Sequence, residues 1–448
     1  MNPPSPSDAI VNRRNAEHLG EDLSEPTSSD TSYMGSRYRY FVLAMLTLTY
    51  AVSLVDRQII AIMIDPIRRD LHLSDTQIGL LSGLAFGLFY AVAAIPLARL
   101  ADGWSKSKVI TLCLCLWSVA TAACSVAGSF AFVFAARIIT GASEGGASST
   151  SQALVADYFP PRQRASALGI YAIGVHLGAG ASLALGGLFV HLFGWRHTFV
   201  LIGLPGIGLA LLLFLMLRDV GGRRFEREAD PFPPFAASVK VLLARRELVL
   251  AAVGVGLSIF ASQALLNWFP AYMMRFYGMS PREVGLHMGM IAAASGAVGV
   301  VVGGKVSDIL ARRHPANRAR LAAAAILVAL PMAVLAVSGG AQQHAFIWFS
   351  AYVFVAGFAT GPAFAIVQNG APPTLRSMAA ALASATTVVI GQAFGPFAPG
   401  FLSDILNGLN VAHSLRVALI CVIACSAVGA IFFWFAATFI ERDGKKDA

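Results

Sequence analysis

Four charged residues lie inside stretches that are otherwise apolar. Asp56 and Arg57 are adjacent within YAVSLVDRQIIAIMI, and Arg137 and Glu144 lie within RIITGASEGG. A charge surrounded by hydrocarbon is costly, so such residues usually pair with one another and mark ion or substrate pathways. Burial favours the protonated form of a carboxyl group, whereas a nearby guanidinium favours the ionised form. The chemistry predicted for these four side chains is therefore reversible proton binding that depends on the position of an arginine.

Helical geometry predicts which of these charges can meet. Arg137 and Glu144 are two helical turns apart and share a face, and Gly141 leaves a groove between them. Asp56 and Arg57 diverge by about 100° and cannot pair well with each other. We predict that Asp56 and Glu144 are alternately protonated and paired with Arg137 and Arg57. The alternative is a static network of buried salt bridges that only fixes helix packing.

The elements that hold these residues are predicted to be membrane-spanning helices. The 448-residue chain is 56% hydrophobic and 13% charged, with a mean hydropathy of +0.67, so we expect an all-α integral membrane protein. Long apolar runs argue against the short alternating strands of a membrane barrel. Twelve stretches are long enough to span a bilayer: 41–63, 77–98, 109–129, 131–153, 165–190, 197–217, 248–272, 284–304, 320–338, 344–368, 378–402 and 414–439.

Composition also predicts the domain order and the orientation. We expect a disordered tail over residues 1–37 and a six-helix bundle over 38–218. A linker over 219–247 should lead to a second six-helix bundle over 248–440 and a short tail over 441–448. Most Lys and Arg fall on the side that carries both termini, which predicts cytoplasmic termini and a multi-pass protein of the inner (plasma) membrane. This asymmetry accounts for the net charge of +9, so no nucleic-acid partner is expected. The five cysteines fall inside predicted spans, and neither disulfides nor a metal site are expected.

The two predicted bundles resemble each other in sequence. LARLADGWSKSK is echoed by VGGKVSDILARR, which aligns Asp102 with Asp308, and PPRQRASALG is echoed by PPTLRSMAAAL, which aligns Arg164 with Arg376. These echoes keep their order at an offset of about 210 residues, which indicates two parallel six-helix repeats.

Two sets of six spans with an acidic, base-flanked loop after spans 2 and 8 resemble the major facilitator superfamily of secondary transporters. GKVSDILARR contains the loop pattern of that family, with Asp308, Arg312 and Arg313. An acid at the end of one helix can accept hydrogen bonds from the N-terminus of a neighbouring helix and from nearby arginines. The resemblance implies a cytoplasmic latch that closes in one conformation and opens in the other. Its predicted residues are Asp102, Asp308, Arg312, Arg313, Arg164 and Arg376.

More specific features resemble the spinster family of lipid transporters within that superfamily. These are VDRQIIA in span 1, SDTQIGLLSGLAFGLFYAVAAIPLARLAD at span 2 and RxxxGxxEGG in span 4, of which the last also occurs in organic-anion and sugar-acid carriers. The resemblance implies proton-coupled transport of lysophospholipids or sphingoid lipids. It also implies that Asp56, Arg137 and Glu144 are central, with Arg57 beside them.

The predicted substrate cavity has a polar wall in the first half and an apolar wall in the second, which suits a charged head and an acyl tail. Ordinary core or lipid-facing packing is the alternative for each aromatic. The predicted lining residues are Arg57, Glu144, Phe260, Gln263, Asn267, Trp268, Tyr352, Phe354, Thr386 and Gln392.

The function predicted from the sequence is proton-coupled secondary transport of amphipathic lipids by alternating access. An organic-anion, sugar-acid or drug:proton transporter of the same superfamily is the alternative, and a receptor or an intramembrane enzyme is the alternative from another class. The sequence contains no P-loop and no catalytic triad, so we expect a transporter without cofactors other than the coupling proton, and not an enzyme. We expect a monomer whose partners are its substrate and the membrane.

Overall fold

The computed structural model describes residues 36–217, 235–372 and 375–444. The predicted N-terminal tail therefore lies almost entirely outside the described residues, as do much of the predicted linker and the last four residues. Contacts divide the chain into Met1–Val42 and Leu43–Ala448, and all packing described below lies within the second unit.

The first half of the chain is helical throughout its described residues. Its elements are α2 (Ser36–Asp70), α3 (Asp75–Gly79), the π-helix η1 (Leu80–Leu84), α4 (Ala85–Gly103), α5 (Lys106–Ala123), the 3₁₀ helix η2 (Cys124–Val126), α6 (Phe130–Tyr158) and α7 (Pro161–Met216). The segment α3–η1–α4 is one continuous span with a π-turn near its start.

The second half repeats this plan. Its elements are α8 (Phe235–Ala244), α9 (Arg246–Tyr277), α10 (Pro281–Ile291), the π-helix η3 (Ala292–Gly296), α11 (Ala297–Ala311), α12 (Asn317–Val337), α13 (Gln342–Gly370), α14 (Arg376–Thr386), the π-helix η5 (Thr387–Ala393), α15 (Phe394–Gly408), α16 (Ser414–Ala424) and α17 (Ser426–Gly444). The short α8 lies within the stretch predicted as a linker.

The described residues form twelve membrane-spanning helices, as predicted. Ten helical segments of the described chain are long and apolar enough to cross a bilayer by themselves. One of these, α7, contains two spans that join at Gly194, where φ is 74°. The remaining span is α6, whose apolar character is reduced by Arg137, Glu144 and several Gly, Ser and Thr residues. The all-α fold is therefore confirmed.

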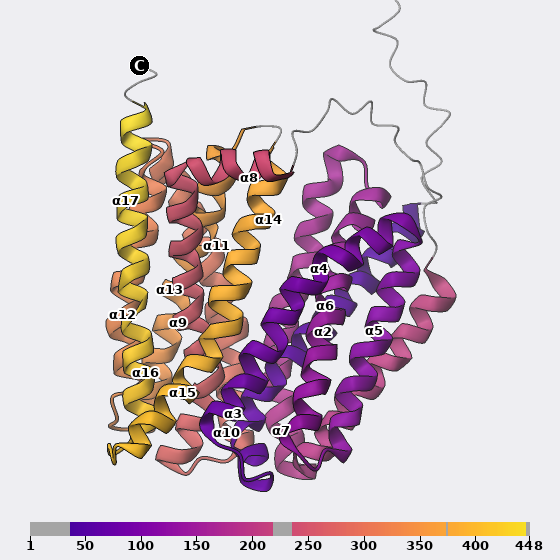
Figure 1. The fold of residues 1–448 in the computed structure, drawn as a ribbon, viewed down its shortest axis with the longest axis vertical. Coiled ribbons are helices and arrows are strands. Elements are labelled where there is room, and N and C mark those ends of the chain that lie inside the picture. The colour runs from indigo at the N-terminus through magenta and orange to yellow at the C-terminus, as the bar shows by residue number, and fades with distance from the viewer. Residues whose placement is uncertain (1–35, 218–234, 373–374, 445–448) are drawn as a thin grey trace, which may run out of the picture. The chain divides into compact units, whose positions relative to one another are not determined.

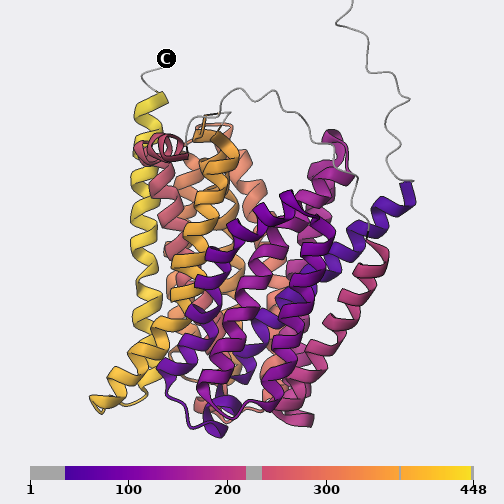
Figure 2. The same cartoon turned by 45° about the vertical axis from the view of Figure 1, so that its right-hand side comes forward.

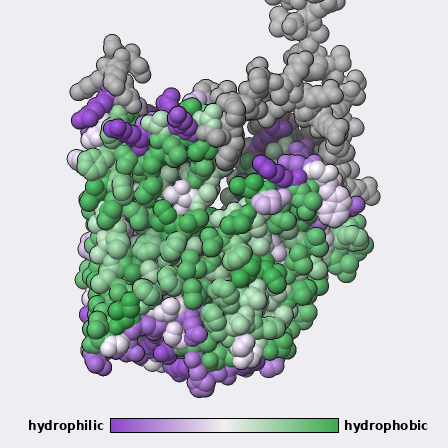
Figure 3. Space-filling view, in the orientation of Figure 1, coloured by the Kyte–Doolittle hydropathy of each residue, from purple (hydrophilic) through white to green (hydrophobic). Residues whose placement is uncertain are grey.

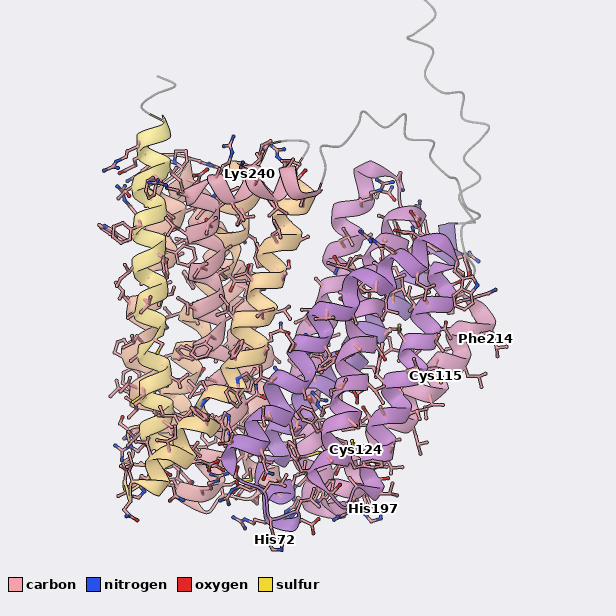
Figure 4. All side chains as sticks on the ribbon, viewed as in Figure 1. His72, Cys115, Cys124, His197, Phe214 and Lys240 are labelled. Carbon is pink, nitrogen blue, oxygen red and sulfur yellow. The ribbon has the colours of Figure 1, made fainter. Side chains whose placement is uncertain are left out.

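The ends of the spans define two faces of the unit Leu43–Ala448. At one end α17 stops and α8 lies across the helices, and we call this the proximal end (Figure 1). At the other, the distal end, α3 begins close to the end of α15 (Figures 1 and 2), and α10 begins against α7. Ser74 and Ser280 start α3 and α10 with complete capping boxes, which satisfy free backbone N–H groups there. Figure 4 shows His72 and His197 at the distal end and Lys240 at the proximal end.

Apolar side chains cover the outside of the helices as well as the core. Exposed Leu, Ile, Val and Phe residues are spread over α5, α7, α11 and α17, and the visible face is apolar between two more hydrophilic ends (Figure 3). A broad exposed apolar surface with polar ends is the arrangement that a bilayer requires.

Candidate functional site

Arg57 and Glu144 form a buried ion pair between α2 and α6. Nη2 of Arg57 lies 3.1 Å from Oε2 of Glu144, and the carboxyl side chain is fully buried while Arg57 is 12% exposed. The hydroxyl of Ser53, one turn before Arg57, donates to the same Oε2 at 2.7 Å. The other oxygen, Oε1, has no hydrogen-bond partner among the described residues. Oε2 of Glu144 thus accepts two hydrogen bonds, and Oε1 is available to bind a proton.

The guanidinium of Arg57 also connects the two halves of the chain. Nη1 lies 3.4 Å from Oε1 of Gln392 in η5, which makes a long hydrogen bond. Phe86 and Tyr90, one turn apart on α4, each lie with the ring centroid 4.9 Å from the Arg57 guanidinium carbon. Such cation–π contacts hold an arginine in place without neutralising it. The surroundings of the Arg57–Glu144 pair therefore include groups from both halves.

Arg137 binds backbone carbonyl groups instead of a carboxylate. Its Nε and Nη1 donate to the carbonyl oxygens of Leu81 and Asp56, each at 3.4 Å. Its guanidinium carbon also lies 4.9 Å from the centre of the Phe86 ring, which is shared with Arg57. The side chain is buried, and its Nη2 has no partner among the described residues. Phe86 thus contacts both arginines of the predicted cluster.

Asp56 is buried and faces α5. Its exposed fraction is 1%, and neither carboxylate oxygen makes a well-formed hydrogen bond with a described residue. Trp117 and Thr121 of α5 are the nearby side-chain donors. The side chains of Asp56 and Arg57 point to different neighbours, as their adjacency on a helix predicts. The predicted pairing of Asp56 with Arg137 is not made in this conformation, because the Arg137 guanidinium is turned toward carbonyl oxygens and the Phe86 ring.

Several contributors to the cluster were missed in the sequence. Ser53 is four residues from Arg57, and Phe86 is four residues from Tyr90, so helical spacing would have found each pair. Tyr50, one turn before Ser53, stacks on Tyr171 of α7 with centroids 4.6 Å apart and ring planes within 4°. These aromatic and hydroxyl groups extend the polar wall along α2.

Of the predicted lining residues in the second half, Gln392 is the one that bonds to the charged cluster. Asn267 is buried and donates to the carbonyl of Gln263, and Thr386 donates to the carbonyl of Leu382. The Tyr352 hydroxyl shares a 2.8 Å hydrogen bond with Ser262. These polar groups therefore make their hydrogen bonds within the second half.

The predicted aromatic lining residues serve packing in this conformation. Trp268 is fully buried and donates from Nε1 to the carbonyl of Pro396 at 2.7 Å, and Phe354 packs edge-on against Phe358. Phe260 lines a wholly apolar cavity of about 490 Å³ between α9, η5, α15 and the α16–α17 turn. Exposed Phe394 and Phe401 lie at this cavity, so it opens on the outside of the second half.

The predicted latch residues at the proximal end do not join the two halves in this structure. Asp308 pairs with Arg318 at 3.0 Å, within the second half. Arg164 donates to the nearby carbonyl of Phe159, within the first half. Asp102 and the remaining latch residues are exposed: Arg312, Arg313 and Arg376.

At the distal end, in contrast, charged residues join the halves directly. Arg275, near the end of α9, places Nη1 and Nη2 each 2.9 Å from the carboxylate oxygens of Asp75 and Nε 2.6 Å from Asp65. Arg68 of α2 and the hydroxyl of Ser403 in α15 also contact Asp75, each at 2.9 Å. Asp65 and Asp75 are almost completely buried, so these bonds replace the water that the carboxylates lose.

Asp404 completes the distal contact. Its carboxylate accepts from the backbone N–H groups of Asp75 and Thr76 at 3.2 and 2.7 Å, and from the Thr76 hydroxyl at 2.6 Å. An acid from α15 therefore caps the helix that begins at α3. The sequence analysis identified neither Arg275 nor these aspartates as site residues.

Comparison with known proteins gives the family context. The sequence pattern described as Major Facilitator Superfamily matches residues 46–396. An MFS-type efflux pump of Mycolicibacterium smegmatis is 32% identical over 92% of this chain and 96% of its own length. The hexuronate transporter of Bacillus subtilis is 27% identical over 62% of this chain and 67% of its own length.

A solved structure shares the fold. It is described as a bacterial homologue of the human lysosomal transporter Spinster in an inward-facing, unoccupied conformation. The TM-score is 0.82 at 26% sequence identity, and the match covers 91% of this chain and 98% of that one. The predicted likeness to the spinster family is therefore confirmed.

Proposed function

The chain belongs to the Major Facilitator Superfamily, and from this premise we propose that it transports an amphipathic lipid in exchange for protons. It is a multi-pass membrane transporter and not an enzyme. Members of this superfamily move two six-helix bundles around a central site. A coupled transporter needs a group near that site whose protonation differs between the two conformations.

The observation that carries the proposal is the bonding of Glu144. Its carboxyl group is fully buried and bonded to Arg57 and Ser53, while Arg57 also reaches Gln392 in the other half. If the halves separate at this level, Arg57 loses Gln392 and its position relative to Glu144 changes. Protonation of Glu144 would then depend on conformation, which is the basis of coupling. Asp56, buried and without a full hydrogen bond, is the second proposed proton carrier.

The lipid assignment is supported by a polar first half and a more apolar second half around the cluster. In the first half, Tyr50, Tyr90 and Arg57 offer hydroxyl and cationic groups to a head group. The second half supplies Phe260 and Phe354, and its wholly apolar cavity, which Phe260 lines, opens on the outer surface of that half. A solved spinster homologue shares the fold, and the lipid itself is taken from the sequence resemblance to the spinster family. We also propose that the proton and the substrate cross the inner membrane in opposite directions. Both termini are proposed to lie on the cytoplasmic side.

A second candidate substrate class follows from the hexuronate transporter and the efflux pump found among the relatives. Arg57, Arg137 and the nearby tyrosines could bind the carboxylate of a sugar acid as well as a lipid phosphate. The two candidate substrate classes differ in whether the substrate must carry an apolar tail.

Uptake into proteoliposomes with an imposed pH gradient tests the proposal. A fluorescent lysophospholipid should be transported by the native protein, competed by unlabelled lysolipids and not by hexuronates. Glu144→Gln should remove the effect of the gradient, whereas Asp157→Asn, a surface acid paired with Lys106, should not. Competition by hexuronates instead of lysolipids would contradict the lipid assignment and leave the coupling proposal standing.

A further inference from the structure

The apolar cavity of the second half lies at the depth of the bilayer core. Phe260, which lines it, is near the middle of α9, about 21 Å from the start of that helix and about 26 Å from its end at 1.5 Å per residue. Phe394 and Phe401 line it as well and are exposed on the outside of the bundle. The molecules that surround a membrane protein at this depth are lipid acyl chains, so the cavity opens toward hydrocarbon.

The two spans that border the cavity with α9 are both irregular beside it. Span 11 (α14–η5–α15) contains the π-helix η5, whose Ile390 lines the cavity. Span 12 is interrupted between α16 and α17 at Cys425, which also lines the cavity. In α7, which contains the corresponding spans 5 and 6, the one departure from helical geometry is at Gly194, where those spans join. The repeated fold therefore does not require these irregularities, and π-turns are common at functional sites.

The size and lining of the cavity favour an apolar occupant. Its volume is about 490 Å³, and its lining is wholly apolar. Water needs polar partners and does not fill such a space. An empty space of this size deprives the lining side chains of dispersion contacts. A flexible acyl chain restores these contacts and gains the free energy of burying its own CH₂ groups.

The π-helix η5 connects the cavity to the charged cluster. Ile390 lines the cavity, and Gln392, two residues later, accepts the hydrogen bond from Arg57. Gly391, between them, is packed tightly against α9, since a Cβ added there would lie 2.5 Å from Cγ2 of Ile259. A chain in the cavity therefore packs against the same short segment that presents Gln392 to the first half.

We propose that the cavity binds one acyl chain of a bilayer phospholipid, and that the bound chain holds η5 in the position from which Gln392 reaches Arg57. The occupant is a resident lipid of the membrane and not the transported substrate. With the cavity empty, the hydrogen bonds of η5 open more readily, because local opening is easiest where packing is sparse. The binding site is independent of the proposed function, whereas its effect on proton coupling through Arg57 rests on that function.

Photo-crosslinking locates the occupant. The protein is reconstituted in vesicles of phosphatidylethanolamine and phosphatidylglycerol that contain a diacyl phosphatidylethanolamine with a diazirine in its acyl chain. Val422 lines the cavity and is buried, so an adduct there requires a chain inside, whereas Trp434 of α17 is exposed and reports ordinary lipid contact. Ala398→Phe fills the cavity from α15 and should remove the Val422 adducts while those at Trp434 remain. If this variant fails to fold, Cys425→Phe fills the cavity from span 12, with the same expected loss.

A tethered chain tests the effect on η5. Cys421 and Cys425 are both exposed and lie one helical turn apart, and of the two it is Cys425 that lines the cavity. Two variants that each retain one of these cysteines, with the other four replaced by alanine, are modified with dodecyl methanethiosulfonate in detergent. They carry the same chain inside or outside the cavity. Hydrogen–deuterium exchange of the η5 backbone should slow by about tenfold or more with the chain on Cys425 and stay unchanged with the chain on Cys421.

The contrary results are equally specific. Absence of Val422 adducts in the native protein, their persistence in folded Ala398→Phe, or equal exchange of η5 in the two tethered proteins would overturn the proposal. Loss of the Val422 adducts when lysophospholipid is added would make the cavity part of the substrate path, which would also overturn it. Neither measurement needs transport, so a failure of gradient-driven uptake bears on the proposed function alone.

Discussion

Arg57 and Glu144 are bonded to each other across α2 and α6, and the same arginine reaches Gln392 in the other half of the chain. This relationship connects a buried acid to the contact between the two halves. Since the halves of a superfamily transporter move relative to each other, we propose that the acid senses that movement through Arg57.

Neutralising Arg57 is expected to destabilise the protein more than neutralising the pair. Arg57→Gln leaves the carboxylate of Glu144 buried without its cation, which typically costs about 3–5 kcal/mol. The double variant Arg57→Gln with Glu144→Gln removes both charges and should recover part of that loss. Thermal unfolding in detergent measures both, and a double variant less stable than Arg57→Gln would contradict the ion pair.

Phe86 is expected to hold both arginines in position. Phe86→Leu keeps an apolar side chain but removes the ring that lies 4.9 Å from each guanidinium. We expect gradient-driven uptake to fall several-fold, since cation–π contacts contribute about 0.5–2 kcal/mol each. Phe132→Leu, an exposed position on α6, is the control. Unchanged uptake in Phe86→Leu would show that the shared ring has no role in coupling.

Removal of the Arg275 side chain should open the distal end. Arg275→Ala leaves Asp65 and Asp75 without the guanidinium that joins the halves, so water should enter there. A cysteine at Phe397, which lies against Gly79 between the halves, should then react faster with a membrane-impermeant maleimide. Arg196→Ala removes an arginine that pairs with Asp70 inside the first half, and it should leave that rate unchanged. Equal rates in all three proteins would contradict a gating role for Arg275.

Gly141 is expected to tolerate no side chain. A Cβ at this position would collide with the carbonyl oxygen of Phe86 and lie 2.9 Å from its Cα. Gly141→Ala should therefore push α4 away from α6 and lower the stability by about 1–3 kcal/mol. Gly208→Ala in α7, where nothing lies within 4 Å of the added atom, is the matched control. Thermal unfolding compares the two, and equal stability would contradict the tight packing of α4 on α6.

Much of the fold and the charged pair follow from the sequence alone. Hydropathy predicts the spans because each must cover a bilayer thickness with apolar residues. Helical spacing predicts that Arg57 faces the helix that carries Glu144, and the two side chains do pair. The prediction is possible because a charge inside a span has few partners other than the charges of neighbouring spans.

The parts that were missed depend on tertiary contacts. Arg275, Asp75 and Asp404 lie near span ends, where charges also serve topology, so nothing in the sequence distinguished those that meet. Trp268 was predicted to line the substrate cavity, but it packs against Pro396 and lies 5.8 Å under the Arg275 guanidinium. An aromatic inside a span has the same pattern in either role, and only its neighbours decide between them.

Proton movement during substrate transport tests the central claim most directly. Proteoliposomes that contain a pH-sensitive dye should show a change in internal pH when lysophospholipid is added to the native protein. Glu144→Gln should abolish this change while it still exchanges labelled for unlabelled lipid, because exchange needs no net proton movement. A proton flux of native size in Glu144→Gln would contradict the account.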